Sequence, residues 1–246
     1  MSSPKLTILI TGSNQGLGYE TARQLSKYPH IHLFLSGRNP ERVQQALESI
    51  SKEDRCKAVL DSVIIDVGDD DSIKAAVKQV EAKLGDAALD VLVNNSGITK
   101  EHEVATRGLR AVFQEVFAVN VFGTAVTADA FLPLLQKSKA GPRIVNMSSG
   151  LGSIGTMILP DGIYRQAQLL VYNSSKTALN SITCTLAMRN PDLHVVSLDP
   201  GWIGTSLNNY SGPGDPKDGV KVVVQHALER TGKSPGFYGN EGEMPW

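Results

Sequence analysis

Two side chains four residues apart, Tyr172 and Lys176, have the clearest capacity for proton transfer in this sequence. On a helix, residues with this spacing lie on one face, so the phenol and the ammonium would be neighbours. A tyrosine titrates at about pH 10 and is a poor acid or base at neutral pH, but an adjacent cation favours the phenolate and lowers its pKa. The pair could therefore exchange protons with a substrate. The same spacing also fits a half-buried aromatic beside a surface lysine.

A second candidate is Ser149, which follows an apolar run over residues 143–147 that predicts a strand. A hydroxyl at the carboxyl end of a strand could hydrogen-bond a substrate carbonyl and polarise it. Two serines at such a place can also simply end the strand or cap the next turn. With Tyr172 as its partner, Ser149 is better explained as a catalytic hydroxyl.

A glycine-rich segment over residues 11–18 joins a predicted strand to a predicted helix near the N-terminus. Gly12 would allow a tight turn, Gly16 would let the backbone approach a phosphate, and Gly18 would let the helix pack closely on the sheet. The start of the helix adds free N–H groups and the positive end of its dipole. This arrangement is typical of a dinucleotide pyrophosphate site, although such turns also occur as plain connections.

The pattern that must position these residues alternates short apolar runs with segments of helical periodicity. We expect strands near 6–11, 31–36, 61–66, 89–94, 142–148, 193–199 and 237–238. We expect helices near 17–28, 40–51, 70–84, 104–136, 172–189 and 216–231. This alternation predicts an α/β fold: one Rossmann-type, doubly wound domain over residues 1–246, with a mostly parallel seven-stranded sheet and helices on both faces. The Gly/Pro-rich residues 201–216 follow a strand and could form a substrate lid, or a plain surface loop.

Composition excludes several classes of partner. The 24 basic and 25 acidic residues balance, so we expect no nucleic-acid binding. Cys56 and Cys184 are too few for a disulfide framework and favour a reducing compartment. A first strand at Leu6 leaves no room for a signal peptide, and no apolar run is expected to reach a membrane span of about 18 residues. We therefore expect a cytoplasmic protein that does not bind membranes.

No metal site is predicted. The five histidines (His30, His32, His102, His194 and His226) lack ligand-like spacing, and we expect them at the surface or at sheet edges. The cluster Asp69-Asp70-Asp71 is better explained as negative charge at a helix N-terminus.

Taken together, these motifs resemble the short-chain dehydrogenase/reductase family from end to end. The matching pieces are the segment 11–18, Asp66-Val67, Asn94-Asn95-Ser96-Gly97, Asn120, Ser149, Tyr172 with Lys176, and Pro200-Gly201 followed by Thr205. The C-terminal residues 236–246 resemble the carbonyl-reductase-like branch more loosely. The resemblance implies that Tyr172 is the general acid, that Ser149 holds the carbonyl oxygen, and that Lys176 lowers the tyrosine pKa and binds the nicotinamide ribose. It also implies that Asn120 holds a water linking Lys176 to solvent.

The resemblance further implies a nicotinamide cofactor, whose chemistry the protein would orient. The implied cofactor-binding residues are Gly12, Ser13, Asn14, Gln15, Gly16, Leu17, Gly18, Asp66, Val67, Asn94, Gly97, Lys176, Pro200, Gly201 and Thr205. Arg38 follows the second strand, where an NAD-binding protein would carry an acidic residue and where an arginine suits the 2′-phosphate of NADP. We therefore predict NADPH/NADP⁺, while an exposed arginine after a turn would also fit.

One departure from the family pattern is the long separation between Ser149 and Tyr172. The extra residues, 155–168, include Met157, Ile158, Leu159, Pro160 and Tyr164. They could shape an apolar substrate pocket or cover the helix face by which such proteins form a homodimer. Tyr164 is not the expected catalytic tyrosine, because Gln168 rather than a lysine follows four residues later.

The sequence thus predicts an NADPH-dependent reductase of ketones or aldehydes that acts on a small carbonyl substrate. The alternatives are an NAD-linked alcohol dehydrogenase, a tailoring reductase of a biosynthetic pathway, and a non-catalytic dinucleotide-binding regulator. The presence of Asn120, Ser149, Tyr172 and Lys176 together weighs against a regulator, which could lose any of them.

Overall fold

The computed structural model describes residues 6–160, 164 and 167–246. The remaining residues, 1–5, 161–163 and 165–166, lie outside this description. The expectation about a signal peptide concerned residues 1–5, and part of the extra segment 155–168 also falls outside the described residues.

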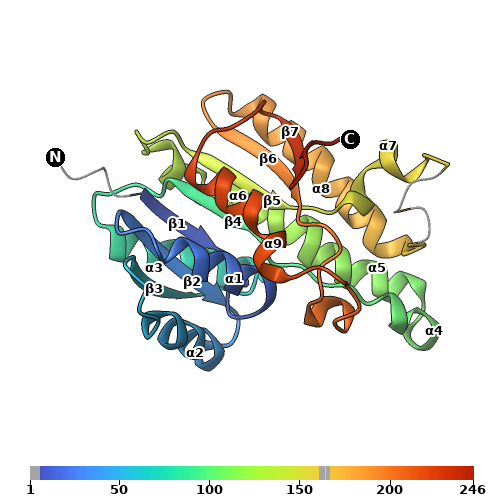
Figure 1. Ribbon diagram of the computed structural model, residues 1–246, viewed down its shortest axis with the longest axis horizontal. Coiled ribbons are helices and arrows are strands. Elements are labelled where there is room, and N and C mark those ends of the chain that lie inside the picture. Colours follow the sequence, from blue (N-terminus) through green and yellow to red (C-terminus); the bar gives the residue numbers. More distant parts are fainter. Residues whose placement is uncertain (1–5, 161–163, 165–166) are drawn as a thin grey trace.

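One sheet of eight strands, counted over the described residues, runs through the molecule in the order β3-β2-β1-β4-β5-β6-β7-β8 (Figure 1). Its strands are β1 (Leu6–Ile10), β2 (Ile31–Gly37), β3 (Val59–Ile64), β4 (Val91–Asn94), β5 (Arg143–Met147), β6 (His194–Asp199), β7 (Gly236–Gly239) and β8 (Gly242–Glu243). The first seven are parallel, and β8 pairs antiparallel with β7. The doubly wound, mostly parallel sheet is confirmed, with one short edge strand beyond the seven predicted. Chain order reverses beside β1, so the carboxyl ends of β1 and β4 to β6 form one edge.

Helices cover both faces of the sheet. The main ones are α1 (Gly16–Leu25), α2 (Pro40–Ser51), α3 (Asp70–Leu84), α6 (Thr124–Gln136), α8 (Leu170–Arg189) and α10 (Lys221–Leu228). Ile8 and Ile10 pack with α1, α2 and α10, whereas Leu9 packs with α3, α6 and α8 on the other face. Because strands covered on both faces bury every side chain, their sequences read as continuous apolar runs rather than alternating ones.

Two helices begin where the sequence predicted them. Asn39 accepts a hydrogen bond from Arg42 N at 2.9 Å and Pro40 occupies the first turn of α2. Asp69 Oδ1 accepts bonds from the backbone N of Asp71 and Ser72 at the start of α3. The aspartate cluster is therefore confirmed as N-terminal helix charge.

The predicted helix over 104–136 is interrupted. It divides into α4 (Val104–Arg107), α5 (Leu109–Phe117), a π-helical turn (Ala118–Gly123) and α6. Gly108 has φ 83° and breaks the first helix. At Gly123 a Cβ atom would lie 2.2 Å from the carbonyl oxygen of Val67, so only glycine allows this approach. The π turn carries Asn120.

The continuous helical stretch Leu109–Gln136 corrects the expectation about apolar runs. It contains a window of mean hydropathy 1.5, long and apolar enough by composition to cross a membrane, and half of that window is buried inside the fold. Phe131 and Leu135 of α6 are fully buried against the sheet. The same pattern arises in a core helix that packs on two neighbouring layers.

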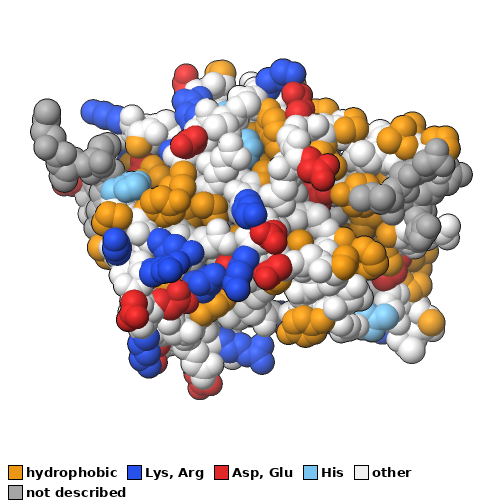
Figure 2. Space-filling view, viewed as in Figure 1, with side chains coloured by type: hydrophobic (Ala, Val, Ile, Leu, Met, Phe, Trp, Pro, Cys, Tyr) orange, Lys and Arg blue, Asp and Glu red, His pale blue; other side chains and the backbone are white. Residues whose placement is uncertain are grey.

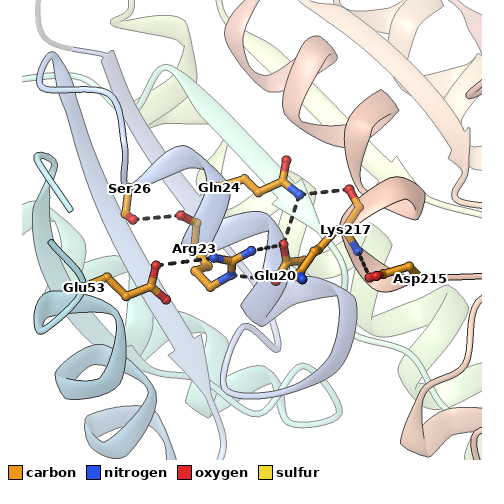
Figure 3. Close-up of polar contacts among 7 residues, drawn as sticks. All are labelled: Glu20, Arg23, Gln24, Ser26, Glu53, Asp215 and Lys217. Atoms are coloured by element: carbon orange, nitrogen blue, oxygen red, sulfur yellow. Dashed lines mark hydrogen bonds and ion pairs between the residues drawn. The ribbon is translucent and has the colours of Figure 1, made fainter. Parts of the chain in front are cut away.

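Helix α1 is also tied to the far end of the 201–216 segment (Figure 3). Gln24 Nε2 donates to the carbonyl oxygen of Lys217 at 2.9 Å, in α9 (Pro216–Gly219). Glu20 holds Gln24 and Arg23 in place through its two carboxylate oxygens. The helix that begins at the glycine-rich turn thereby anchors the base of the predicted lid.

The expectation that all histidines lie at the surface or at sheet edges is wrong for His32, which is 8% exposed in the inner strand β2, and for the pair His194 and His226. Both are 4% exposed, and they lie between β6 and α10. The His226 ring stacks on Tyr238 with centroids 4.9 Å apart. Burial, with a smaller effect of His194, lowers the pKa of His226 to about 4.

This burial predicts acid sensitivity. The folded-state pKa lies below the unfolded value, so the contribution of neutral His226 is present above about pH 6.5 and is lost as the pH falls towards about 4. His226→Phe keeps a stacking ring that cannot be charged. Between about pH 7 and about pH 5 it should lose about 2 kcal/mol less free energy of unfolding than the wild type. Urea denaturation at both pH values measures this, and His102→Gln, at an exposed site, is the control. Equal losses in wild type and His226→Phe would contradict the assignment.

Candidate active site

The glycine-rich turn has the geometry that a phosphate site needs. Gly12 has φ +63°, and a Cβ there would lie 2.8 Å from Ser96 Oγ. A Cβ on Gly18 would lie 2.4 Å from Asn95 Nδ2, so both glycines are required by packing. Gly16 has φ +59° with nothing within 4 Å of its Cβ position, at the first residue of α1. The start of this helix is therefore accessible, and its first N–H groups lack intrahelical partners.

Asn95 holds this turn, a role that the sequence did not reveal. Its Nδ2 donates to the carbonyl oxygens of Thr11 at 2.8 Å and of Gly12 at 3.1 Å. The Thr11 hydroxyl in turn accepts from the backbone N of Asn95 and Ser96. The segment after β4 thus fixes the turn after β1.

Two predicted cofactor residues direct their side chains inward. Asn94 Nδ2 donates to Asn146 Oδ1 at 2.9 Å, and the residue is 4% exposed. The Ser13 hydroxyl accepts from Ser36 N at 2.7 Å and joins β1 to β2. Only the backbone of these residues could therefore line a cofactor site. Neighbouring residues of the turn are half-buried (Asn14, Leu17) or exposed (Gln15, Gly16).

Arg38 is exposed directly after β2, beside the glycine-rich turn. The two segments touch at Gly37, where a Cβ would lie 2.6 Å from Asn14 Oδ1. After β3, Asp66 is half-buried and its Oδ1 accepts from Gly68 N at 3.0 Å, while Val67 is buried. All of these residues follow the carboxyl ends of strands.

The predicted catalytic residues converge beyond the end of β5. Ser149 Oγ accepts from Leu151 N at 3.2 Å, so it does cap the turn that follows, and its hydroxyl acts to lower the pKa of the Tyr172 phenol. Tyr172 lies in the first turn of α8. Lys176, one turn on, donates from Nζ to the carbonyl oxygen of Met147 at 2.7 Å, and its Nζ is 5.6 Å from the centroid of the Tyr172 ring.

The electrostatics of this group differ from the expectation. Withdrawal from solvent raises the pKa of Tyr172 above its ordinary value, and the charge of Asp199 raises it further, while the Ser149 hydroxyl acts to lower it. Burial lowers the pKa of Lys176 to about 8. The predicted lowering of the Tyr172 pKa by Lys176 is therefore not seen here. The lysine directs its ammonium to Met147, and the Asp199 carboxylate acts on the Tyr172 pKa in the opposite direction.

Asn120 connects three parts of the site. Its side chain is fully buried, accepts from Ile98 N at 2.8 Å, and donates to Ile98 O at 2.9 Å and to Ser175 Oγ at 3.0 Å. A Cβ on Gly97 would lie 3.5 Å from both Asn120 Oδ1 and Lys176 Nζ. Both polar atoms therefore lie beside the Cα atom of Gly97, which carries no side chain.

The segment 201–216 follows β6 and folds back on itself through a bridge between Ile203 and Gly214. Gly201, at φ +84°, donates its N–H to Asp199 Oδ1 at 3.0 Å, and Thr205 is buried at the start of a 3₁₀ turn. Several apolar side chains of this segment and of the neighbouring helices are exposed: Ile154, Ile158, Leu159, Leu170, Trp202, Leu207 and Tyr210. Figure 2 shows apolar side chains gathered on the side of the molecule that carries α5, α7 (Ile154–Met157) and α8.

Glu101 is a second residue that the sequence did not single out. Position 169, before α8, supplies no side-chain cap. Instead, the Glu101 carboxylate accepts from Val171 N at 3.2 and 3.3 Å and from Tyr172 N at 3.3 Å. An anion at this end also interacts favourably with the helix dipole. Glu101 thus fixes the turn that carries Tyr172.

We expect Glu101→Ala to lower the free energy of unfolding by about 1 kcal/mol, as the loss of a helix cap does. It should also lower kcat more than it raises KM, because the first turn of α8 loosens around Tyr172. Glu101→Gln keeps one acceptor and should restore part of kcat. Denaturation and steady-state kinetics measure both effects, with the exposed Glu81→Ala as control. A kcat that is unchanged in Glu101→Ala would refute the positioning role.

A doubly wound sheet with a glycine-rich first turn, and with Ser, Tyr and Lys gathered at its carboxyl edge, defines a dinucleotide-dependent oxidoreductase. The sequence profile of the short chain dehydrogenase family matches residues 6–215. The chain belongs to the short-chain dehydrogenase/reductase family of nicotinamide-dependent oxidoreductases, and it is similar to the carbonyl reductases within it.

Individual relatives agree with this assignment. The short-chain dehydrogenase anuI of Penicillium roqueforti is 37% identical over 93% of this chain and 91% of its own length. A short-chain dehydrogenase/reductase of Aspergillus fumigatus is 35% identical over 100% and 98%. The NADPH-bound carbonyl reductase from chicken fatty liver superposes with a TM-score of 0.85 at 27% identity, over 99% of this chain and 100% of that one. The carbonyl reductase Sniffer of D. melanogaster gives 0.79 at 31%, with the same coverage.

Proposed function

We propose that this protein reduces a ketone or aldehyde to an alcohol with NADPH. The observation that carries the proposal is the meeting of the Tyr172 phenol, the Ser149 hydroxyl and the Lys176 ammonium at the carboxyl end of β5. The likeness to an NADPH-bound carbonyl reductase over the whole chain supports it.

The residues present fit a nicotinamide dinucleotide. We assign the pyrophosphate to the start of α1, where Gly16 leaves open space, with the turn of residues 12–18 around it. Asp66 and Val67 would flank the adenine, and Arg38 would contact a 2′-phosphate. The nicotinamide end would be held by the backbone of Asn94, by Gly97 and Lys176, and by Pro200, Gly201 and Thr205. When bound, the cofactor supplies the hydride that the carbonyl carbon receives.

The protein's own part is to hold the carbonyl and deliver a proton. Ser149 would donate a hydrogen bond to the carbonyl oxygen, and Tyr172 would transfer its phenolic proton to that oxygen as the carbon receives the hydride. The raised pKa keeps Tyr172 protonated at neutral pH, which is the form that reduction requires. The phenolate left behind would be stabilised by the Lys176 ammonium and reprotonated through it. We assign to Asn120 the placement of a water between Lys176 and solvent.

We expect Tyr172→Phe to fold, to bind NADPH as the wild type does, and to lose at least about 99% of turnover, since general acid catalysis contributes about 10²–10⁴-fold. Tyr28→Phe removes the same hydroxyl from a distant loop and should stay active. Circular dichroism, cofactor titration and NADPH oxidation at 340 nm with a ketone and aldehyde panel measure these outcomes. Wild-type turnover in Tyr172→Phe would overturn the assignment.

Arg38 is proposed to select NADPH over NADH. No carboxylate stands beside it in Gly37-Arg38-Asn39, and a guanidinium makes charge-assisted hydrogen bonds to phosphate. Arg38→Ala should weaken NADPH binding about ten- to a hundredfold and leave NADH binding nearly unchanged. Titration calorimetry with both cofactors gives the ratio. An unchanged ratio would favour the NAD-linked alternative.

We further propose that the chain forms one domain in which residues 201–216 act as the substrate lid. We also propose that the protein is cytoplasmic, has no membrane or nucleic-acid partner, and forms a homodimer. The lid is supported by its exposed apolar side chains and its place after β6, and the reducing location by the free thiols of Cys56 and Cys184. The dimer is supported by the outer faces of the π turn and α8, where Phe122 is 60% and Met188 is 69% exposed.

A further inference from the structure

Tyr164, from the extra segment between Ser149 and Tyr172, lies beside the proposed active site. A Cβ atom on Gly150 would lie 2.2 Å from Cζ and 2.5 Å from the hydroxyl oxygen of Tyr164. The phenol ring therefore rests on the backbone of the residue that directly follows Ser149. Only a glycine at position 150 leaves room for the ring.

The Tyr164 hydroxyl is bound to a buried carboxylate. It donates to Asp199 Oδ2 at 2.7 Å, at the end of β6, while Asp199 Oδ1 accepts from Gly201 N at 3.0 Å. Asp199 is 4% exposed. Its charge also raises the pKa of Tyr172. Tyr164 and Asp199 together link the ends of β5 and β6 next to Ser149 and Tyr172.

The direction of the hydrogen bond defines what this pair can recognise. Because the phenolic hydrogen of Tyr164 points to Asp199, the oxygen has only lone pairs to offer any further partner, and the carboxylate increases its strength as an acceptor. A substrate without a donor there would leave a desolvated acceptor unpaired, which is unfavourable. A hydroxyl group would satisfy it.

We propose that Tyr164, held by Asp199, is a specificity-determining residue that selects carbonyl substrates bearing a hydroxyl group over those without one. The inference rests on the proposed reductase function. A competing explanation is that the Tyr164–Asp199 bond only anchors the extra segment to the sheet. That role would affect all substrates equally.

The test compares acetophenone with 2-hydroxyacetophenone and with the 2′-, 3′- and 4′-hydroxy isomers. The wild type should show about a tenfold higher kcat/KM for at least one hydroxylated ketone than for acetophenone, and Tyr164→Phe should bring that ratio close to one. Asp199→Asn, which can still accept the bond without the charge, should give an intermediate ratio. Tyr28→Phe should keep the wild-type ratio.

Binding of the same ketones in the presence of NADP⁺, followed by calorimetry, separates this inference from the proposed reaction. A hydroxyl preference in binding that Tyr164→Phe abolishes would support the recognition role even if no ketone were reduced. Absence of any preference in the wild type, in both binding and turnover, would overturn it. An equal loss for acetophenone and the hydroxylated ketones in Tyr164→Phe would overturn it as well, in favour of the anchor.

Discussion

The site depends on one buried charge, the ammonium of Lys176, which is 4% exposed and hydrogen-bonded to the carbonyl oxygen of Met147. Burying an ammonium is costly unless its donors are satisfied. Here the last carbonyl of β5 satisfies one of them, which draws α8 onto the end of that strand. Ser148 strengthens the same contact by donating to Asn180 Oδ1 at 2.6 Å. Tyr172, one turn before Lys176, is thereby placed beside Ser149.

A series of hydrogen-bonded, buried polar side chains also joins α8 to the sheet. Asn94 bonds to Asn146, Asn146 Nδ2 donates to Thr183 Oγ1 at 2.9 Å, and the Thr183 and Ser197 hydroxyls are 2.8 Å apart. The series crosses from β4 through β5 and α8 to β6, and buried hydrogen bonds of this kind favour one relative packing of these elements. These hydrogen bonds, together with apolar burial, fix the position of α8 and of the helix face that carries Tyr172 and Lys176.

Local sequence patterns predicted the features that depend on local chemistry. The continuous apolar runs gave the parallel sheet, Asn39 and Asp69 gave the helix starts, and the spacing of Tyr172 and Lys176 placed both on one helix face. The features that were missed join distant segments. Glu101 caps a helix that begins about seventy residues later, and Asp199 reaches Tyr172 from another strand. The periodicity of a sequence reports local structure and not contacts between distant segments. The direction of the shift in the Tyr172 pKa, the inward orientation of the Asn94 side chain and the burial of His226 therefore could not be predicted.

We propose that a carbonyl carbon receives hydride from NADPH while Tyr172 protonates the oxygen. The most direct test uses NADPH labelled with deuterium at either C4 position and mass spectrometry of the alcohol formed from the ketone and aldehyde panel. With the wild type we expect one of the two labelled cofactors, and not the other, to give an alcohol with deuterium on its carbinol carbon. Absence of label from both cofactors, with every member of the panel, would contradict it.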